Sequence, residues 1–142
     1  MATLNNLADG LRARIATLGA TAITAYSEPT EDPQSPMSGA SAEIVWLNRD
    51  QLSTCNERAR FGVDVSVAAL DKGWSRSIRL LRQYTDKTGA LSVEAVIEGD
   101  RTLGIAGVDS VAVRAGPERL VKYANGLRWL ARIEVDVFYP TA

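Results

Sequence analysis

The amino-acid sequence predicts an α+β fold, a mainly antiparallel sheet of four to five strands with two main helices packed on one face. An apolar stripe at helical spacing occupies the N-terminal segment, and two long segments alternate between apolar and polar residues as half-buried strands do. Strands and helices do not alternate in the rhythm that a parallel sheet requires. At 142 residues and 15.3 kDa, the chain has the length of one domain, and we expect residues 1–142 to form it.

The first helix is predicted from apolar residues that recur at steps of three and four. They are Leu4, Leu7, Leu11, Ile15 and Leu18. Thr3 can cap the start of this helix, and Gly19 can end it. A short helical turn is expected at 92–98, ahead of a glycine-rich connection at 98–107.

A second helix is predicted at about 73–84, with Asp71 as its N-cap. Its apolar stripe consists of Trp74, Ile78, Leu81 and Tyr84. Beside the stripe lie Arg76, Arg79 and Arg82. These arginines form either a solvated basic face or one side of an interface, where they would pair with Asp or Glu of a neighbouring subunit.

Five segments carry strand signals. They are residues 20–26, 43–47, 60–70, 108–115 and 127–139. The last is the strongest, because apolar and polar residues alternate along it, and Asn125-Gly126 just before it suits a hairpin turn. Its partner is either 120–123 or the end of the strand at 108–115. The polar stretch 48–58 is expected to connect two strands.

Residues 27–40 predict a long, exposed, Pro-rich loop. Pro29, Pro33 and Pro36 stand there among Ser, Thr, Asp and Gly. Loops of this length are uncommon inside compact domains unless they have a function or lack fixed structure. The segment is therefore either an arm that contacts a partner or a flexible connector.

Four apolar residues are left over from the predicted core. Val45 and Leu47 lie on the second face of a strand whose first face is already apolar, and Leu130 and Phe138 stand on the polar face of the last strand. Single exposed apolar residues are normal on a monomer. The alternative is that another subunit covers them.

The residue types of most catalytic sites are sparse. Without any His, the chain cannot form a Ser-His-Asp or Cys-His site and has little to offer a transition metal. Cys55 is the single Cys, so it has no partner for an intrachain disulfide. Solvent exposure accounts for the strand carboxylates Asp64, Glu134 and Asp136. Residues 104–107 lack the Lys-Ser/Thr pair of a phosphate loop. We expect no enzymatic activity, no cofactor and no metal.

The charges nearly cancel, with 16 basic and 17 acidic residues. A strongly basic footprint is absent, so any contact with nucleic acid is expected to be local or independent of base sequence. No apolar run approaches the roughly 18 residues of a membrane span, and the first ten residues do not have the pattern of an export signal. The sequence thus predicts synthesis in the cytoplasm without export.

The order of elements resembles the tail-terminator proteins of long-tailed phages, of the lambda type. The most distinctive parts of this resemblance are Thr24-Ala25-Tyr26 leading into the Pro-rich loop, residues 92–104, and Gly126-Leu127-Arg128-Trp129-Leu130-Ala131 entering the last strand. It spans almost the whole chain, and none of its motifs is a catalytic signature.

The resemblance implies a hexameric ring that caps the completed tail tube at the head-proximal end of the tail. The partners it implies are further copies of this chain, the major tail-tube protein and the head-completion or connector protein. DNA would only pass through the channel without sequence recognition, which the near-neutral charge permits. The resemblance implies no cofactor, no reaction and a location in the virion.

Two other functions stay open at this point. A head-completion or neck protein of the head-tail joint has a similar size and a similar mixed fold. A small-molecule-binding or carboxylate-only enzymatic domain is the alternative of another class, and a deep pocket with converging polar groups would distinguish it.

Overall fold

The computed structural model describes residues 3–36, 39–53, 55–69, 74–105 and 107–140, and it confirms the predicted α+β fold. Its elements are, in chain order, α1 (Leu4–Ala16), β1 (Ile23–Tyr26), β2 (Ala40–Gln51), β3 (Asn56–Ala68), α2 (Trp74–Thr85), α3 (Val93–Glu98), β4 (Ser110–Tyr123) and β5 (Gly126–Pro140). No helix in the described ranges is long and apolar enough to cross a bilayer.

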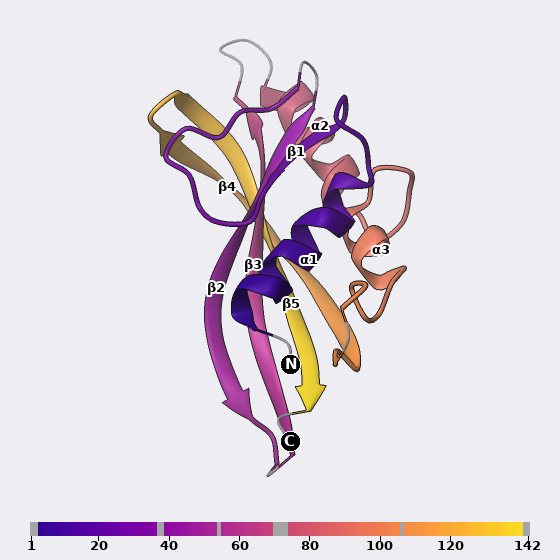
Figure 1. Ribbon diagram of the computed structural model, residues 1–142. Coiled ribbons are helices and arrows are strands. Elements are labelled where there is room, and N and C mark those ends of the chain that lie inside the picture. Colours follow the sequence, from indigo (N-terminus) through magenta and orange to yellow (C-terminus); the bar gives the residue numbers. More distant parts are fainter. Residues whose placement is uncertain (1–2, 37–38, 54, 70–73, 106, 141–142) are drawn as a thin grey trace.

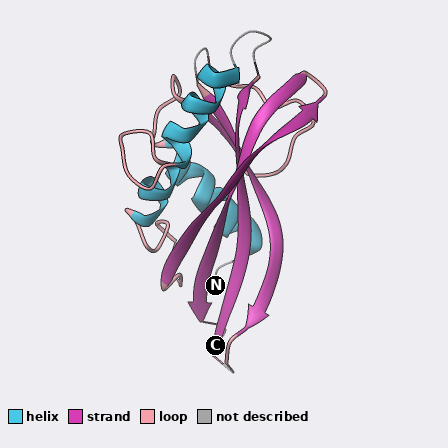
Figure 2. Cartoon of the chain, turned by 180° about the vertical axis from the view of Figure 1, so that it is seen from behind, coloured by secondary structure: helices cyan, strands magenta, loops and turns pink. Residues whose placement is uncertain are grey.

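All five strands form one twisted sheet in the order β1-β2-β3-β5-β4 (Figure 1). Every neighbouring pair is antiparallel except β1 and β2, which are parallel. The helices lie together on one side of this sheet, as the view from behind also shows (Figure 2). We call that side the helix face and the opposite side the outer face.

The core lies between the helices and the two central strands. Phe61 and Val63 of β3 stand opposite Val135 and Ile133 of β5, and all four side chains are buried. Leu7, Leu11 and Ile15 of α1 are fully buried against this layer. Burying one such side chain stabilises the fold by roughly 1.5–3 kcal/mol. The apolar residues of the alternating strands therefore lie on the helix face, where they are buried.

The helix caps follow local hydrogen-bonding chemistry. Thr3 caps α1, because its hydroxyl accepts a hydrogen bond from the backbone N–H of Asn6 at 3.2 Å. Ser92 does the same for α3, accepting from the N–H of Ala95 at 3.1 Å. Gly19 follows α1 with a φ of 108°, which favours glycine and redirects the chain into β1. The predicted cap Asp71 lies outside the described residues.

The strands on either side of the polar stretch 48–58 extend further into it than the predicted bounds 43–47 and 60–70. β2 continues to Gln51 and β3 already begins at Asn56, so most of that stretch is a two-stranded ladder. Arg58 pairs with Asp50 across the strands, and Arg49 Nε lies 3.9 Å from Glu57 Oε2. Opposite charges across an antiparallel pair stabilise a hairpin that has no apolar residues to bury.

The two candidate partners of the last strand belong to one strand. β4 runs from Ser110 to Tyr123 and pairs with β5 on both sides of an irregularity between Ala115 and Glu118. Pro117 lies within that irregularity, where proline costs no ladder hydrogen bond. Ala124 and Asn125 form the turn to β5, and Gly126 follows with a φ of 120°.

The parallel pairing of β1 with β2 explains the length of the Pro-rich loop. Parallel neighbours need a crossover of about a dozen residues or more, because the chain must return along the full length of the strand. Here the crossover contains no helix in its described part and runs from the end of β1 past the turn of the β4–β5 hairpin to the start of β2 (Figure 1).

Candidate functional site

The Pro-rich loop is fixed to the sheet by its own backbone. The N–H of Thr30 donates to Glu43 Oε2 at 3.2 Å, and the N–H of Gln34 donates to Tyr26 Oη at 3.1 Å. At the hairpin turn, the N–H of Ala124 donates to the carbonyl of Glu31 at 3.1 Å. These hydrogen bonds give the described part of the loop, residues 27–36, a defined path against the sheet.

The three prolines of the loop have different surroundings. Pro33 is buried, and its carbonyl accepts a hydrogen bond from Asn125 Nδ2 at 2.7 Å. Pro36 is half-buried, whereas Pro29 is exposed. Among the described residues of the loop, Gln34 and most of residues 28–32 are exposed, so the crest at 28–32 is largely open to a partner.

A buried polar cluster on the outer face joins three strands. Arg128 of β5 is 4 % exposed and donates from Nε to Ser66 Oγ at 2.9 Å, while its Nη2 lies 3.4 Å from Ser41 Oγ. Ser41 and Ser66 also share a hydrogen bond of 3.0 Å. Burial lowers the pKa of Arg128, so the hydroxyls and the Ser66 carbonyl compensate for part of the lost hydration.

Glu43 lies at the border of this cluster, beneath the loop. Its side chain is almost fully buried, and burial is the main reason that the pKa of its carboxyl is raised. Glu43 Oε1 has no hydrogen-bond partner among the described residues. Burial, together with the carboxylates of Glu43 and Asp64, raises the pKa of nearby Tyr123 to about 12. Sequence patterning missed this cluster, because alternation along strands assigns such residues to a wet face.

The predicted interface residues of the outer face do not form one surface. Leu130 was predicted to be left for a neighbouring subunit, but it is only 2 % exposed within its own chain. It stands between Ser66 and Arg119 in the strand register. That expectation needs correction, because side chains of its own chain already cover Leu130, which therefore offers a neighbour almost no area.

Val45 and Phe138 are half-buried on the outer face and lie apart from each other. Val45 shares its row with Gly62, and Phe138 shares its row with Arg58. Between these rows Arg60 Nε lies 2.9 Å from Asp136 Oδ1. Leu47, also half-buried, occupies the irregularity between Trp46 and Asn48 in β2.

The arginines of α2 are all exposed, and one of them is engaged within the chain. Arg82 Nε lies 2.5 Å from Glu118 Oε1 of β4, and this hydrogen bond lowers the pKa of that carboxyl. Arg76 and Arg79 form no ion pair with any residue in the described ranges. They are the two arginines of the predicted set that remain open to a partner.

Exposed apolar residues gather near the β4–β5 turn on the helix face. Trp74 is 49 %, Leu127 45 % and Leu120 37 % exposed. Leu120 stands opposite Trp129 in the register, and the ring of Trp129 meets that of Trp74 edge to face. We call these four residues the tryptophan patch. Part of it could have been predicted from the sequence, because Leu120 and Leu127 lie on either side of the predicted hairpin turn and fall on the same face of the two strands.

Large apolar side chains are also exposed along the β2–β3 hairpin. Trp46 lies on the helix face of β2 but is 52 % exposed, and Leu52 in the β2–β3 turn is 50 % exposed. In the register, β5 begins beside the end of β3 and finishes beside its start. The β2–β3 turn and the β4–β5 turn are therefore at opposite ends of the molecule.

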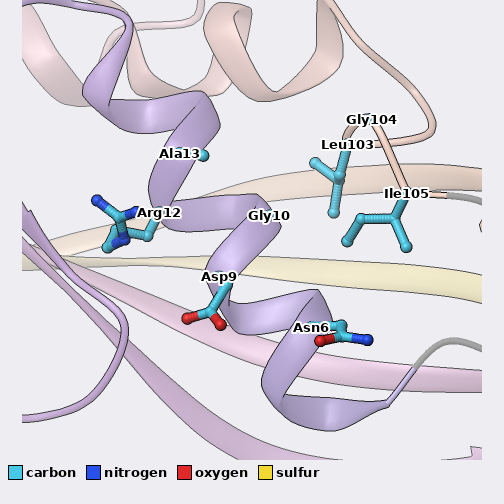
Figure 3. A pocket seen from close by; sticks show the side chains of 8 residues that line it. All are labelled: Asn6, Asp9, Gly10, Arg12, Ala13, Leu103, Gly104 and Ile105. Carbon is cyan, nitrogen blue, oxygen red and sulfur yellow. The ribbon is translucent and has the colours of Figure 1, made fainter.

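A hollow of about 650 Å³ lies between α1 and the segment 103–105. Its volume is in the range of ligand sites. Asp9 and Arg12 point to the other side of α1 from Leu103 and Ile105, so the polar groups do not converge (Figure 3). A Cβ on Gly10 would come within 2.5 Å of Ile105 Cδ1, so glycine permits this close packing of helix and loop.

The described residues contain no group of three or more His, Cys, Asp or Glu side chains that could hold a metal. Asp64, one of the strand carboxylates, binds Arg132 through two hydrogen bonds of 2.7 and 3.1 Å. Glu134 pairs with Arg114 at 2.6 Å. Each of these carboxylates thus neutralises an arginine across the strands, and the geometry is that of sheet stabilisation.

No known family model matches this sequence, and no curated protein matches it either.

Proposed function

We propose that this chain is a structural subunit of a long-tailed phage tail that assembles into a hexameric ring, caps the tail tube and ends its polymerisation. In this function the ring occupies the terminal surface of the tube and presents a new surface to the head connector. The mechanism is binding geometry, and no bond is made or broken. DNA passes through the ring without sequence recognition.

The observation that carries the proposal is the exposed apolar surface in two separate regions of one small domain. The tryptophan patch lies at the β4–β5 end, and Trp46 and Leu52 lie along the β2–β3 hairpin. A ring subunit needs different surfaces for its two neighbours and for the structures above and below it. Large apolar side chains are the residues that such interfaces bury.

The order of elements also supports the proposal. Helix, short strand, Pro-rich crossover, two long strands, helix, short helix and a final long hairpin follow one another as in the family that the sequence resembles. The hollow beside α1 gives little support to the alternative of a small-molecule or carboxylate-only enzymatic domain, since its polar groups point apart.

Light scattering and electron microscopy of the chain with the tail-tube protein of the same phage test this function. We expect a hexameric mass on the tube end, rings in end-on views, and tubes that stop growing when the chain is added. A chain that never binds tube ends contradicts the proposal. Binding to the head connector without any effect on tubes would identify a neck protein instead.

A further inference from the structure

Two surfaces of opposite character lie near the β4–β5 turn, and they lie on opposite faces of the sheet. The first is the tryptophan patch on the helix face. Lys122 adds a positive charge to it, because it stands opposite Leu127 in the register and shares the face of Leu120. Its side chain is exposed and forms no ion pair with the described residues.

Arg79 adds a second positive charge beside this patch. It precedes Arg82 by three residues, and residues three apart share one flank of a helix. Arg82 reaches Glu118 of β4, so this flank of α2 faces β4, the strand that carries Leu120 and Lys122. Arg79 is exposed and, unlike Arg82, has no carboxylate partner in the described ranges.

The second surface is the crest of the Pro-rich loop. Glu28, Glu31 and Asp32 are exposed there together with Pro29, and no Lys or Arg interrupts residues 27–36. None of the three carboxylates forms an ion pair within the described part of the chain. We call residues 28–32 the acidic crest.

The acidic crest is held in place before any partner arrives. Its backbone is fixed in the middle by the hydrogen bond from Thr30 to Glu43, and near its end by the hydrogen bond from Ala124 to Glu31. Asn125 secures the next residue, Pro33. A surface fixed in this way loses little conformational entropy on binding, so more of the contact energy appears as affinity.

The crest of one chain does not cover the patch of the same chain. Thr30 reaches Glu43, which stands opposite Asp64 on the outer face, whereas Leu120 and Leu127 lie on the helix face. The sheet at the hairpin thus separates the two surfaces. Two copies arranged with the helix face of one toward the outer face of the next bring them together, and repetition of such a contact gives a ring when the rotation closes.

We propose that the acidic crest of one copy docks on the tryptophan patch of the next copy. Trp74 and Leu127 are buried in this contact, and Glu31 and Asp32 meet Lys122 and Arg79. Exposed tryptophan beside arginine is the composition of interface residues that carry most of the binding energy. This inference rests on the proposed ring, for which it names the contact between neighbouring subunits.

Charge reversal tests the contact with the full-length chain. The crest variant carries Glu31→Lys and Asp32→Lys, and the patch variant carries Arg79→Glu and Lys122→Glu. Either variant alone should lose the multimer in light scattering, with association weakened about tenfold or more for each lost charge pair of roughly 1.4 kcal/mol or more. An equimolar mixture should recover the multimer, because each crest then meets a patch of opposite charge.

A control variant carries Glu98→Lys and Arg101→Glu, two exposed charges near α3 whose reversal leaves the net charge unchanged, and should retain the wild-type mass. Variants that keep the wild-type multimer overturn the inference but leave the ring itself intact. Loss in both variants without recovery in the mixture also overturns it.

A second measurement applies if the chain assembles only weakly. Asp32→Cys and Lys122→Cys are introduced together in a Cys55→Ser background, and the concentrated chain is oxidised. A ladder of disulfide-linked multimers is expected, and each single-cysteine variant should stop at the dimer. A doubly substituted chain that stays monomeric contradicts the crest-to-patch contact. If the wild type also never binds tube ends, the proposed function fails separately.

Discussion

Trp74 packs edge to face against Trp129, with ring centroids 5.6 Å apart and planes at 84°. The contact joins the first turn of α2 to β5 at the rim of the sheet. Trp129 is half-buried, whereas Trp74 leaves about half of its surface open. The pair can therefore act in two ways. It holds the start of α2 against β5, and it exposes apolar surface that a partner could cover.

Trp74→Ala should lower the free energy of unfolding by about 1.5–3 kcal/mol, because the aromatic pair contributes roughly 0.5–1.5 kcal/mol and the buried half of the side chain roughly another 1–1.5 kcal/mol. Urea unfolding monitored by circular dichroism measures the loss. Its effect on assembly should be far larger than its effect on stability. A loss of several kcal/mol would mean that Trp74 belongs to the core, contrary to its exposure.

Leu130→Ala should lower the free energy of unfolding by about 2–5 kcal/mol, the range for a buried leucine. The reason is that its own chain already covers this side chain on the outer face. Phe138→Ala, on the same face but half-buried, is the matched comparison and should cost less. Equal and small losses of stability from both variants would contradict the burial of Leu130.

Gly39→Ala should destabilise the start of β2 by about 1–3 kcal/mol, as overpacking does. A Cβ at this position would lie 2.6 Å from the carbonyl oxygen of Ala22, which accepts the N–H of Ala40. The backbone at Ala22 cannot move aside as easily as the end of a flexible side chain can. Thermal unfolding checks this, with Gly89→Ala as a contrast, since nothing lies within 4 Å of a Cβ there and its cost comes from its positive φ alone.

Glu43 should make stability depend on pH in the sense opposite to an ordinary salt-bridged carboxylate. Burial raises the pKa of its carboxyl above the ordinary value of 4.5. The folded state therefore holds the proton more tightly than the unfolded state, so this contribution to stability is complete below pH 4.5 and is lost as pH rises through the folded pKa.

Glu43→Gln removes that titration and keeps an oxygen that can accept from Thr30. Relative to wild type, the variant should gain stability as pH rises from below 4.5 to neutrality. Urea unfolding over this range, with Glu31→Gln as the exposed control, measures the difference. If the stability of the variant relative to wild type fell with rising pH, attraction to Arg128 rather than burial would have the larger effect on the pKa of the Glu43 carboxyl.

Local patterning predicted the elements whose causes are local. The stripe from Leu4 to Leu18, the Thr3 cap and the alternation from Leu127 to Tyr139 each reflect interactions within a few residues, and the structure has those elements. Local patterning missed the parallel pairing of β1 with β2. It also missed that residues 108–115 and 120–123 belong mostly to one strand, β4. Both depend on contacts between residues distant in sequence, which a short window cannot reveal.

The surfaces were less predictable than the fold. Leu130 and Phe138 have the same sequence pattern, since both are apolar residues on a polar strand face, but Leu130 is buried whereas Phe138 is only half-buried. In the sequence Arg128 has the pattern of a solvated strand residue, whereas in the structure it is buried and forms hydrogen bonds with Ser41 and Ser66. Leu120 and Leu127 of the tryptophan patch follow from the pattern around the β4–β5 turn, but the contribution of Trp74 required the position of α2, which hydrophobic periodicity does not give.

The most direct test of the central claim is the growth of tail tubes in the presence of the purified chain, followed by light scattering and electron microscopy. We expect that substoichiometric chain, at about six copies for each tube, stops elongation and leaves one ring at the tube end. Tubes that grow at the same rate to the same length, with no chain at their ends, would contradict it.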